Sequence, residues 1–218
     1  MGRRWLYLTR HGETDWNAAG RWQGHTDIPL NAKGRAQAEA VAVALQNVGL
    51  SGIVSSDLSR AYETARIVGD RLGLTVAYVD TDLRERAFGP FEGLTREECV
   101  RFHPAAWRAW IEEHCPPEGA EGRPALAKRV AAAIGRVARQ VALSDAPALV
   151  VTHGGALRAA VMLATGSLPA PIPNGAIWRI EWDEQIVAAE VVPDRGSPPP
   201  LNPPSPSQAS PNRLRGDR

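Results

Sequence analysis

An arginine and a histidine stand side by side directly after a short apolar run near the start of the chain. The run is Trp5-Leu6-Tyr7-Leu8, and Arg10-His11-Gly12-Glu13-Thr14 follows it closely. A neutral imidazole can attack phosphorus, and an adjacent guanidinium stays charged and can hold phosphoryl oxygens at two points. Gly12 permits a sharp exit from the strand and a close backbone approach to an anion. The pattern predicts phosphoryl chemistry at a strand end, against the alternative of a core strand that ends in a surface Arg-His pair.

The same order of strand, histidine, glycine and helix recurs later in the chain. Leu149-Val150-Val151-Thr152 has the composition of a buried strand, and His153-Gly154-Gly155 follows it, ahead of a helix-like segment from Ala156 to Leu163. Catalytic groups gather at the carboxyl ends of strands in open α/β sheets. We therefore expect His11 and His153 to face one crevice.

Two further strand ends could supply a second cation and a carboxyl group. Ile53-Val54-Ser55-Ser56 leads to Arg60 at the start of a helix, and this guanidinium could reach the same anion. Leu83-Arg84-Glu85 precedes a segment rich in glycine and aromatic residues, Phe88 to Gly93. Glu85 is the candidate proton donor to a leaving oxygen.

Together these blocks make the chain resemble the histidine phosphatase superfamily, which contains cofactor-dependent phosphoglycerate mutases and many small phosphatases. The resemblance extends from about Trp5 to Val192. It rests on five blocks in the expected order: Leu8 to Thr14, Gln23 to Leu30, Ser55 to Ala61, Leu83 to Glu85 and Thr152 to Gly155. Such separated motifs in one order are far more specific than any of them alone.

The resemblance implies a role for each matching residue. It implies that His11 is the phosphorylated nucleophile, that Glu85 is the general acid and base, and that a phosphate pocket is formed by Arg10, Arg60 and His153. Further positions that would touch the substrate are Asn17, Gln23, Gly24 and Gly154. The implied reaction proceeds in two displacements through a phosphohistidine. The arginines and a protonated His153 would supply the positive charge, so no metal and no cofactor are expected.

Composition indicates one enzyme domain. The chain has 218 residues, of which 44% are hydrophobic and 22% charged, enough for a sizeable core. A net charge of +1 gives no reason to expect nucleic acid or an anionic membrane as a partner. No apolar run approaches the roughly 20 residues of a membrane helix, and the N-terminus enters a strand, which favours a cytoplasmic protein. Cys99 and Cys115 lack metal-type spacing and are expected to be free, buried or half-buried thiols.

Strands and helices alternate along the chain. Strands are predicted near 5–9, 52–55, 76–79, 148–152, 176–182 and 186–192, with helices over 31–48, 58–72, 124–143 and 156–163. This pattern predicts an α/β fold, a three-layer α/β/α sandwich with a mostly parallel central sheet, over residues 1–192. An exposed strand edge near 176–192 could pair with a second subunit to form a homodimer.

The segment 88–122 is expected to form a small, irregular cap over the pocket and to decide substrate choice. An apolar wall could be lined by Phe88, Phe91, Trp107 and Trp110. The favoured alternative is that the two tryptophans only pack a cap helix onto the core. Thr95 with Glu98 predicts a capping box. Packing or turn roles, not ligand contacts, are expected for Trp16, Trp22 and His25.

Residues 193–218 differ abruptly from the rest of the chain. They contain eight prolines in 26 residues and hardly any large apolar side chain. Such a segment cannot form a core, and we expect a disordered Pro-rich C-terminal tail. The sharper alternative is that Ser197 to Pro204 docks onto an aromatic groove of a partner protein.

Three functions fit these residues. The leading one is a phosphomonoester hydrolase that acts on a small phosphorylated metabolite. The second is a phosphoglycerate mutase, a group that usually has an Arg-Arg pair after the acid and a tyrosine near it. Here no such pair lies between Glu85 and His153 and Phe88 takes the tyrosine position, although Glu85-Arg86 resembles the mutase dipeptide. The third is a non-catalytic relative that only binds a phosphorylated ligand, which the intact residue set disfavours.

Overall fold

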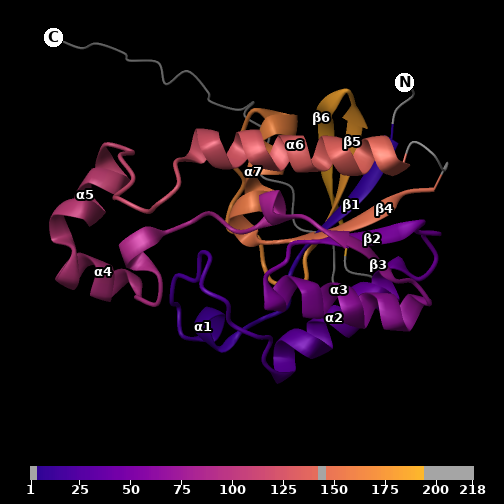
Figure 1. Cartoon of the computed structure of the whole chain (residues 1–218), viewed down its shortest axis with the longest axis horizontal. Helices are drawn as coiled ribbons and strands as arrows, with labels where there is room; N and C mark the ends of the chain where they lie inside the picture. Colours follow the sequence, from indigo (N-terminus) through magenta and orange to yellow (C-terminus); the bar gives the residue numbers. More distant parts are fainter. Residues whose placement is uncertain (1–3, 142–145, 194–218) are drawn as a thin grey trace, which may run out of the picture.

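The apolar runs form one six-stranded sheet in the order β3-β2-β4-β1-β5-β6. The structure is a computed structural model that describes residues 4–141 and 146–193 (Figure 1). Its strands are β1 (Arg4–Arg10), β2 (Gly52–Ser55), β3 (Val76–Val79), β4 (Ala148–Thr152), β5 (Ile177–Asp183) and β6 (Gln185–Val192). The first four are mutually parallel, whereas β5 is antiparallel to β1 and β6 to β5. Only Glu184 separates β5 from β6, and so short a connection can only reverse the chain.

Helices cover both faces of the sheet, which confirms the predicted three-layer α/β/α sandwich. The helices are α1 (Asp15–Ala18), α2 (Ala32–Leu45), α3 (Ser59–Leu72), α4 (Arg96–Phe102), α5 (Pro104–Glu112), α6 (Arg123–Val141) and α7 (Gly154–Thr165). Two short 3-10 helices, η1 (Thr81–Leu83) and η2 (Gly89–Phe91), flank the acid loop. In Figure 1, α2 and α3 lie below the sheet, and α6 and α7 lie above it.

The central strand β4 shows why two helical layers are needed. All five of its residues are buried. Leu149 and Val151 pack in the cluster of α2 and α3, whereas Val150 packs in the cluster of α6 and α7. Successive side chains of a strand point to opposite faces, so a strand that is apolar throughout must be covered on both.

The cap is more regular than we predicted. Residues 88–122 contain α4 and α5 as well as η2, so the expectation of an irregular segment was wrong there. The predicted capping box is present: the Thr95 side chain accepts from the Glu98 N–H, and the Glu98 side chain accepts from the Thr95 N–H. His103 separates the two helices, and Pro104 begins α5 in the position where its missing N–H costs nothing.

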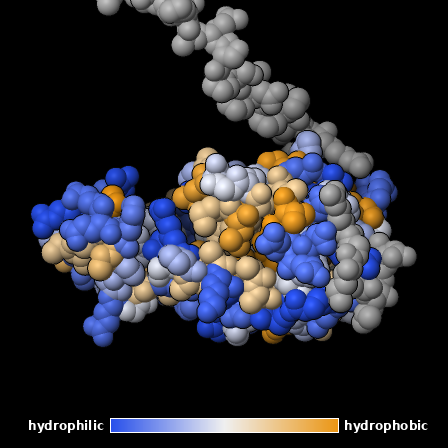
Figure 2. Space-filling model, turned by 90° about the horizontal axis from the view of Figure 1, so that it is seen from above, coloured by the Kyte–Doolittle hydropathy of each residue, from blue (hydrophilic) through white to orange (hydrophobic). Residues whose placement is uncertain are grey.

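The cap has its own small hydrophobic core of Phe88, Phe91, Cys99 and Trp110. In the space-filling view the cap stands as a lobe set apart from the sandwich, with hydrophobic residues gathered on the sandwich surface beside it (Figure 2). Cys115 is exposed, which corrects the expectation of two buried or half-buried thiols, and both cysteines are free.

The predicted Pro-rich tail, residues 193–218, lies outside the described residues except for Pro193. Within the two described ranges, no helix combines the length and the apolar character needed to cross a membrane.

Candidate active site

His11 follows β1 directly and is almost completely buried, with 2% of its surface exposed. Its Nδ1 lies 2.6 Å from the Gly12 carbonyl oxygen. Because a carbonyl oxygen can only accept, Nδ1 carries the proton and Nε2 keeps its lone pair. Burial, and then the charges of Arg60 and Arg10, lower the pKa of His11 well below 6.5. His11 is therefore a neutral imidazole with a free nucleophilic nitrogen.

Gly12 holds this loop in place by close packing. A Cβ at this position would lie 2.2 Å from the Gly34 carbonyl oxygen at the start of α2. The Gly12 N–H donates to Thr64 Oγ1 over 3.1 Å, and that hydroxyl donates to the Arg60 carbonyl oxygen over 2.7 Å. The glycine therefore allows a close approach to the backbone of α2, and the approach to an anion that we expected stays a prediction.

His153 follows β4, the parallel neighbour of β1, and its ring centroid lies 5.0 Å from that of His11. Its Nε2 lies 2.9 Å from Ser56 Oγ, and its buried Nδ1 has no hydrogen-bond partner among the described residues. Burial first, and then Arg60, His11 and Arg10, lower the pKa of His153 well below 6.5. Burial and the two fixed cations beside the ring thus favour its neutral form, and a His153 that is protonated against a bound phosphate stays a prediction.

Those cations are Arg60, which is fully buried in the first turn of α3, and Arg10 at the end of β1. Arg60 donates to the carbonyl oxygens of Gly24 and Thr26 at 2.8 and 2.9 Å, and Arg10 donates to that of Ile172 at 2.7 Å. In both, the buried Nε has no hydrogen-bond partner within the described chain. Burial lowers the pKa of Arg60 to about 10 and also lowers that of Arg10. Both remain charged at neutral pH, with donors left for an anion.

Asn17 lies in α1, whose capping box it forms with Thr14. Its side-chain oxygen accepts from the Thr14 N–H at 3.2 Å and from Asn174 Nδ2 at 3.2 Å, which leaves its NH₂ group to donate to a ligand. Asn174 also donates to the His11 carbonyl oxygen at 3.0 Å. The sequence analysis missed Asn174, whose only signal is its place in the turn before β5.

Gln23 and Gly24 line the same cavity as His11. The Gln23 side-chain oxygen is buried and has no partner in the described part of the chain. Gly24 has a φ of +56°, and a Cβ there would lie 1.9 Å from Glu92 Oε1, so only glycine fits. That carboxylate accepts from the backbone N–H groups of His25 and Phe88, each at 3.0 Å, and so ties this loop to the cap.

The Glu85 carboxylate lies at the N-terminus of α7. Its Oε1 accepts from the Arg86 N–H at 2.8 Å, and its Oε2 accepts from the Gly155 N–H at 3.0 Å. A Cβ on Gly155 would lie 2.2 Å from Glu85 Oε1. Gly154, the predicted backbone donor, lines the cavity, and a Cβ there would lie 3.3 Å from Arg10 Nε. The close approach of the Glu85 carboxylate thus requires glycine at position 155, whereas the contact at position 154 is only tight.

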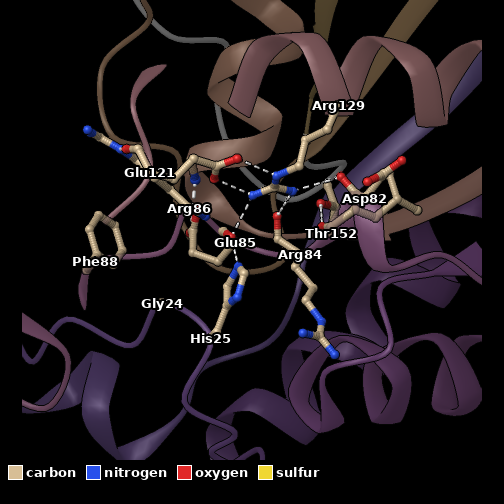
Figure 3. Close-up of polar contacts among 12 residues, drawn as sticks. Gly24, His25, Asp82, Arg84, Glu85, Arg86, Phe88, Glu121, Arg129 and Thr152 are labelled. Carbon is tan, nitrogen blue, oxygen red and sulfur yellow. Dashed lines mark hydrogen bonds and ion pairs between the residues drawn. The ribbon is translucent and has the colours of Figure 1, made fainter. Parts of the chain in front are cut away.

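The main chain of Glu85 is held from two sides (Figure 3). Its carbonyl oxygen accepts from Arg129 Nη2 at 2.8 Å and from His25 Nε2 at 2.9 Å. Arg129 also donates to the carbonyl oxygens of Asp82 and Arg84, and it forms a two-point ion pair with Glu121. His25 therefore has the structural role that we predicted. Arg129 was missed, because an arginine in the middle of a helix gives no sequence signal for this contact.

The site opens into a cavity of about 710 Å³. Phe88 and Trp110 line it, whereas Phe91 and Trp107 do not and pack inside the cap. Trp22 packs edge-on against Phe88 with ring centroids 4.6 Å apart, the packing role that we predicted, and it also lines the cavity. The structure thus brings all nine predicted site residues to one place, and of these only His153 is not part of the cavity wall.

Comparison with known proteins identifies the family. Residues 6–194 match the model of the histidine phosphatase superfamily, branch 1. A glucosyl-3-phosphoglycerate phosphatase of Mycobacterium tuberculosis is 36% identical over 84% of this chain and 86% of its own. A protein of Enterobacter sp. named "Probable phosphoglycerate mutase GpmB" is 37% identical over 82% of this chain and 85% of its own. The chain belongs to the histidine phosphatase superfamily and is an enzyme of that superfamily.

Solved structures agree with this assignment. A mycobacterial glucosyl-3-phosphoglycerate phosphatase in complex with VO3 superposes with a TM-score of 0.75 at 34% identity, over 86% of this chain and 97% of the other. An alpha-ribazole phosphatase from Shigella flexneri superposes with a TM-score of 0.72 at 28% identity, over 86% and 94%. The family therefore includes relatives named for different substrates.

Proposed function

We propose that this protein is a metal-independent phosphomonoester hydrolase that acts on a small phosphorylated metabolite through a phosphohistidine at His11. The observation that carries the proposal is the free Nε2 of a neutral His11 in a cavity walled by Arg10 and Arg60. A neutral nucleophile and two charged guanidiniums are the groups that a phosphoryl dianion needs for in-line attack.

In the first displacement, a bond forms between His11 Nε2 and phosphorus as the ester P–O bond breaks. The guanidiniums of Arg10 and Arg60 stabilise the charge on the non-bridging oxygens. The Gly12 carbonyl, 2.6 Å from Nδ1, accepts a hydrogen bond from the ring as it gains positive charge. Glu85, when protonated, gives its proton to the departing alkoxide.

In the second displacement, the Glu85 carboxylate takes a proton from water while the water oxygen attacks phosphorus. The N–P bond breaks, and phosphate and neutral His11 are released. The same carboxyl group thus acts as acid and then as base, so its position must be well defined in both steps. The two backbone N–H groups on its oxygens and the two donors on its carbonyl support that role.

Hydrolysis is favoured over mutase activity by the residues around the acid. Phe88 lines the cavity without a hydroxyl group, and the sequence between Glu85 and His153 has no adjacent arginine pair. Relatives named as phosphatases and relatives named as mutases match this chain at similar identity. The dipeptide Glu85-Arg86 also resembles that of the mutases. A phosphoglycerate mutase is therefore the second candidate.

The deciding experiment measures phosphate release from a panel of phosphomonoesters in EDTA, with conversion of 3-phosphoglycerate to the 2-isomer followed in parallel. We expect release by the wild type, loss of release in His11→Ala, and no loss in a control variant at the exposed His114, His114→Ala. Isomer formation without net phosphate would establish the mutase. Release that persists in His11→Ala would contradict the phosphohistidine route.

A further inference from the structure

The cavity contains three arginines that phosphoryl transfer at His11 does not use. Arg86 follows the proposed acid, Arg123 is the first residue of α6, and Arg158 lies in α7. All three line the same cavity as His11 and Arg10. Arg86 lies in a loop and the other two lie in different helices, so only the tertiary fold gathers them.

Two of these arginines are anchored so that their terminal nitrogens remain available. Arg86 Nε donates to the Glu121 carbonyl oxygen at 2.6 Å, and its guanidinium carbon lies 4.2 Å from the Trp110 ring centroid. Arg158 Nε donates to the Pro169 carbonyl oxygen at 3.0 Å. Within the described chain, no hydrogen bond or ion pair involves the Nη atoms of Arg86 and Arg158. The same holds for the side chain of Arg123, which is exposed. A guanidinium fixed through Nε presents its two NH₂ groups to an anion.

The positive charge of this group is not balanced locally. Burial and then the charge of Arg123 lower the pKa of both Arg86 and Arg158, that of Arg86 to about 10, so the three guanidiniums repel one another. The carboxylates that face them are Glu121 and Glu85. Glu121 pairs at two points with Arg129, and Glu85 is held by two backbone N–H groups.

We propose that Arg86, Arg123 and Arg158 form a second anion subsite, which binds a carboxylate or second phosphate on the alcohol portion of the substrate. The inference rests on the proposed function, since it places the transferred phosphoryl group at His11. A cavity of about 710 Å³ has room for both anions and a carbon skeleton between them. Apolar side chains for that skeleton line the wall: Leu126, Met162, Leu168 and Ile172.

The test uses pairs of esters that differ only in the second anion. One pair is 3-phosphoglycerate and glycerol 3-phosphate, in which a carboxylate replaces a hydroxymethyl group. The other is fructose 1,6-bisphosphate and fructose 6-phosphate. We expect the wild type to show a kcat/KM about tenfold or more higher for the anionic member of one pair, as charge-assisted hydrogen bonds imply. The preferred pair identifies the second anion as a carboxylate or a phosphate.

Variants show whether the three arginines cause this preference. Arg123→Ala and Arg158→Ala should each reduce the ratio within the preferred pair by about fivefold or more, mainly through KM, and Arg158→Lys should restore part of it. Arg108→Ala is the matched control, because Arg108 is exposed on the cap and does not line the cavity. Equal rates for both members of both pairs, or equal losses on both members in the variants, would overturn the subsite.

A binding measurement separates this inference from the proposed hydrolysis. Calorimetric titration of His11→Ala with the same four esters reports affinity without turnover. Tighter binding of the anionic member, lost in His11→Ala/Arg158→Ala, would support the subsite even if the wild type released no phosphate, an outcome that would contradict only the hydrolase. Equal affinity within both pairs would contradict the subsite even if the hydrolase were established.

Discussion

The imidazole rings of His11 and His153 lie with their centroids 5.0 Å apart and their planes at 62°, although one follows β1 and the other follows β4. The register explains this contact. Arg10 pairs with Thr152 in adjacent parallel strands, so the next residue of each strand arrives at the same edge of the sheet. Two buried imidazoles this close, beside Arg10 and Arg60, are both held in the neutral form.

Because both rings are buried in the neutral form, we expect the free energy of unfolding to fall in acid. For both histidines the pKa in the folded protein is below the unfolded value of 6.5, so the unfolded chain binds more protons below that pH. The free energy of unfolding should be constant above pH 6.5 and fall by about 1.4 kcal/mol per histidine per pH unit below it, until the folded pKa is reached. Urea unfolding at pH 7.5 and 5.5 measures this difference, which His11→Asn should reduce and His114→Asn should leave unchanged. A wild-type stability that is equal at both pH values would show that the two histidines are not buried in the neutral form.

Glu85→Gln should affect esters according to their leaving groups. If Glu85 protonates the departing oxygen, kcat for an alkyl phosphate should fall by about 10² to 10⁴, and by much less for p-nitrophenyl phosphate, whose phenolate needs little protonation. Glu118→Gln, at an exposed position on the cap, is the matched control. Equal losses on both esters would remove Glu85 from the role of acid.

Arg129 should act on catalysis only through the position of Glu85. Arg129→Met removes the donor to the Glu85 carbonyl and leaves Glu121 unpaired, so we expect a loss of about 2 kcal/mol in stability and about tenfold in kcat. If Arg129 positions Glu85, the loss in kcat should be greater for alkyl than for aryl esters, as we expect for Glu85→Gln. A loss of stability with no dependence on the leaving group would mean that Arg129 is only structural. Arg129→Lys keeps the charge without the planar fork and should recover the stability more than the rate.

Variants of Gly154 and Gly155 also test whether catalysis depends on the position of the Glu85 carboxylate. Gly155→Ala would place a methyl group 2.2 Å from Glu85 Oε1, so the carboxylate must move, and kcat should fall by about 10². Gly154→Ala would place its methyl group 3.3 Å from Arg10 Nε, a contact that a small shift relieves, and should cost much less. The kcat values of both variants on one alkyl phosphate provide the comparison. Similar losses in the two would indicate a general disturbance of α7 instead.

Much of this protein is determined by local sequence. The apolar runs that become β1 and β4, the glycines after them and the capping box at Thr95 are each specified by a few consecutive residues. That is why the strands, the main helices and the strand-end histidines could be predicted before the fold was known. The cap was misjudged as irregular because its two helices are short and their buried side chains belong to a small cluster with Phe88 and Phe91, separate from the cores of the sandwich.

Only the tertiary structure decided how distant residues act on one another. It brought Arg129 from α6 to the Glu85 carbonyl and placed Asn174 beside His11. It also gathered Arg86, Arg123 and Arg158 in one cavity, and it placed His153 beside the two cations that lower its pKa. Residue type and spacing specify the backbone locally, but a hydrogen bond, a cavity wall or a pKa depends on which groups the folded chain brings within a few ångströms and on how much water it excludes.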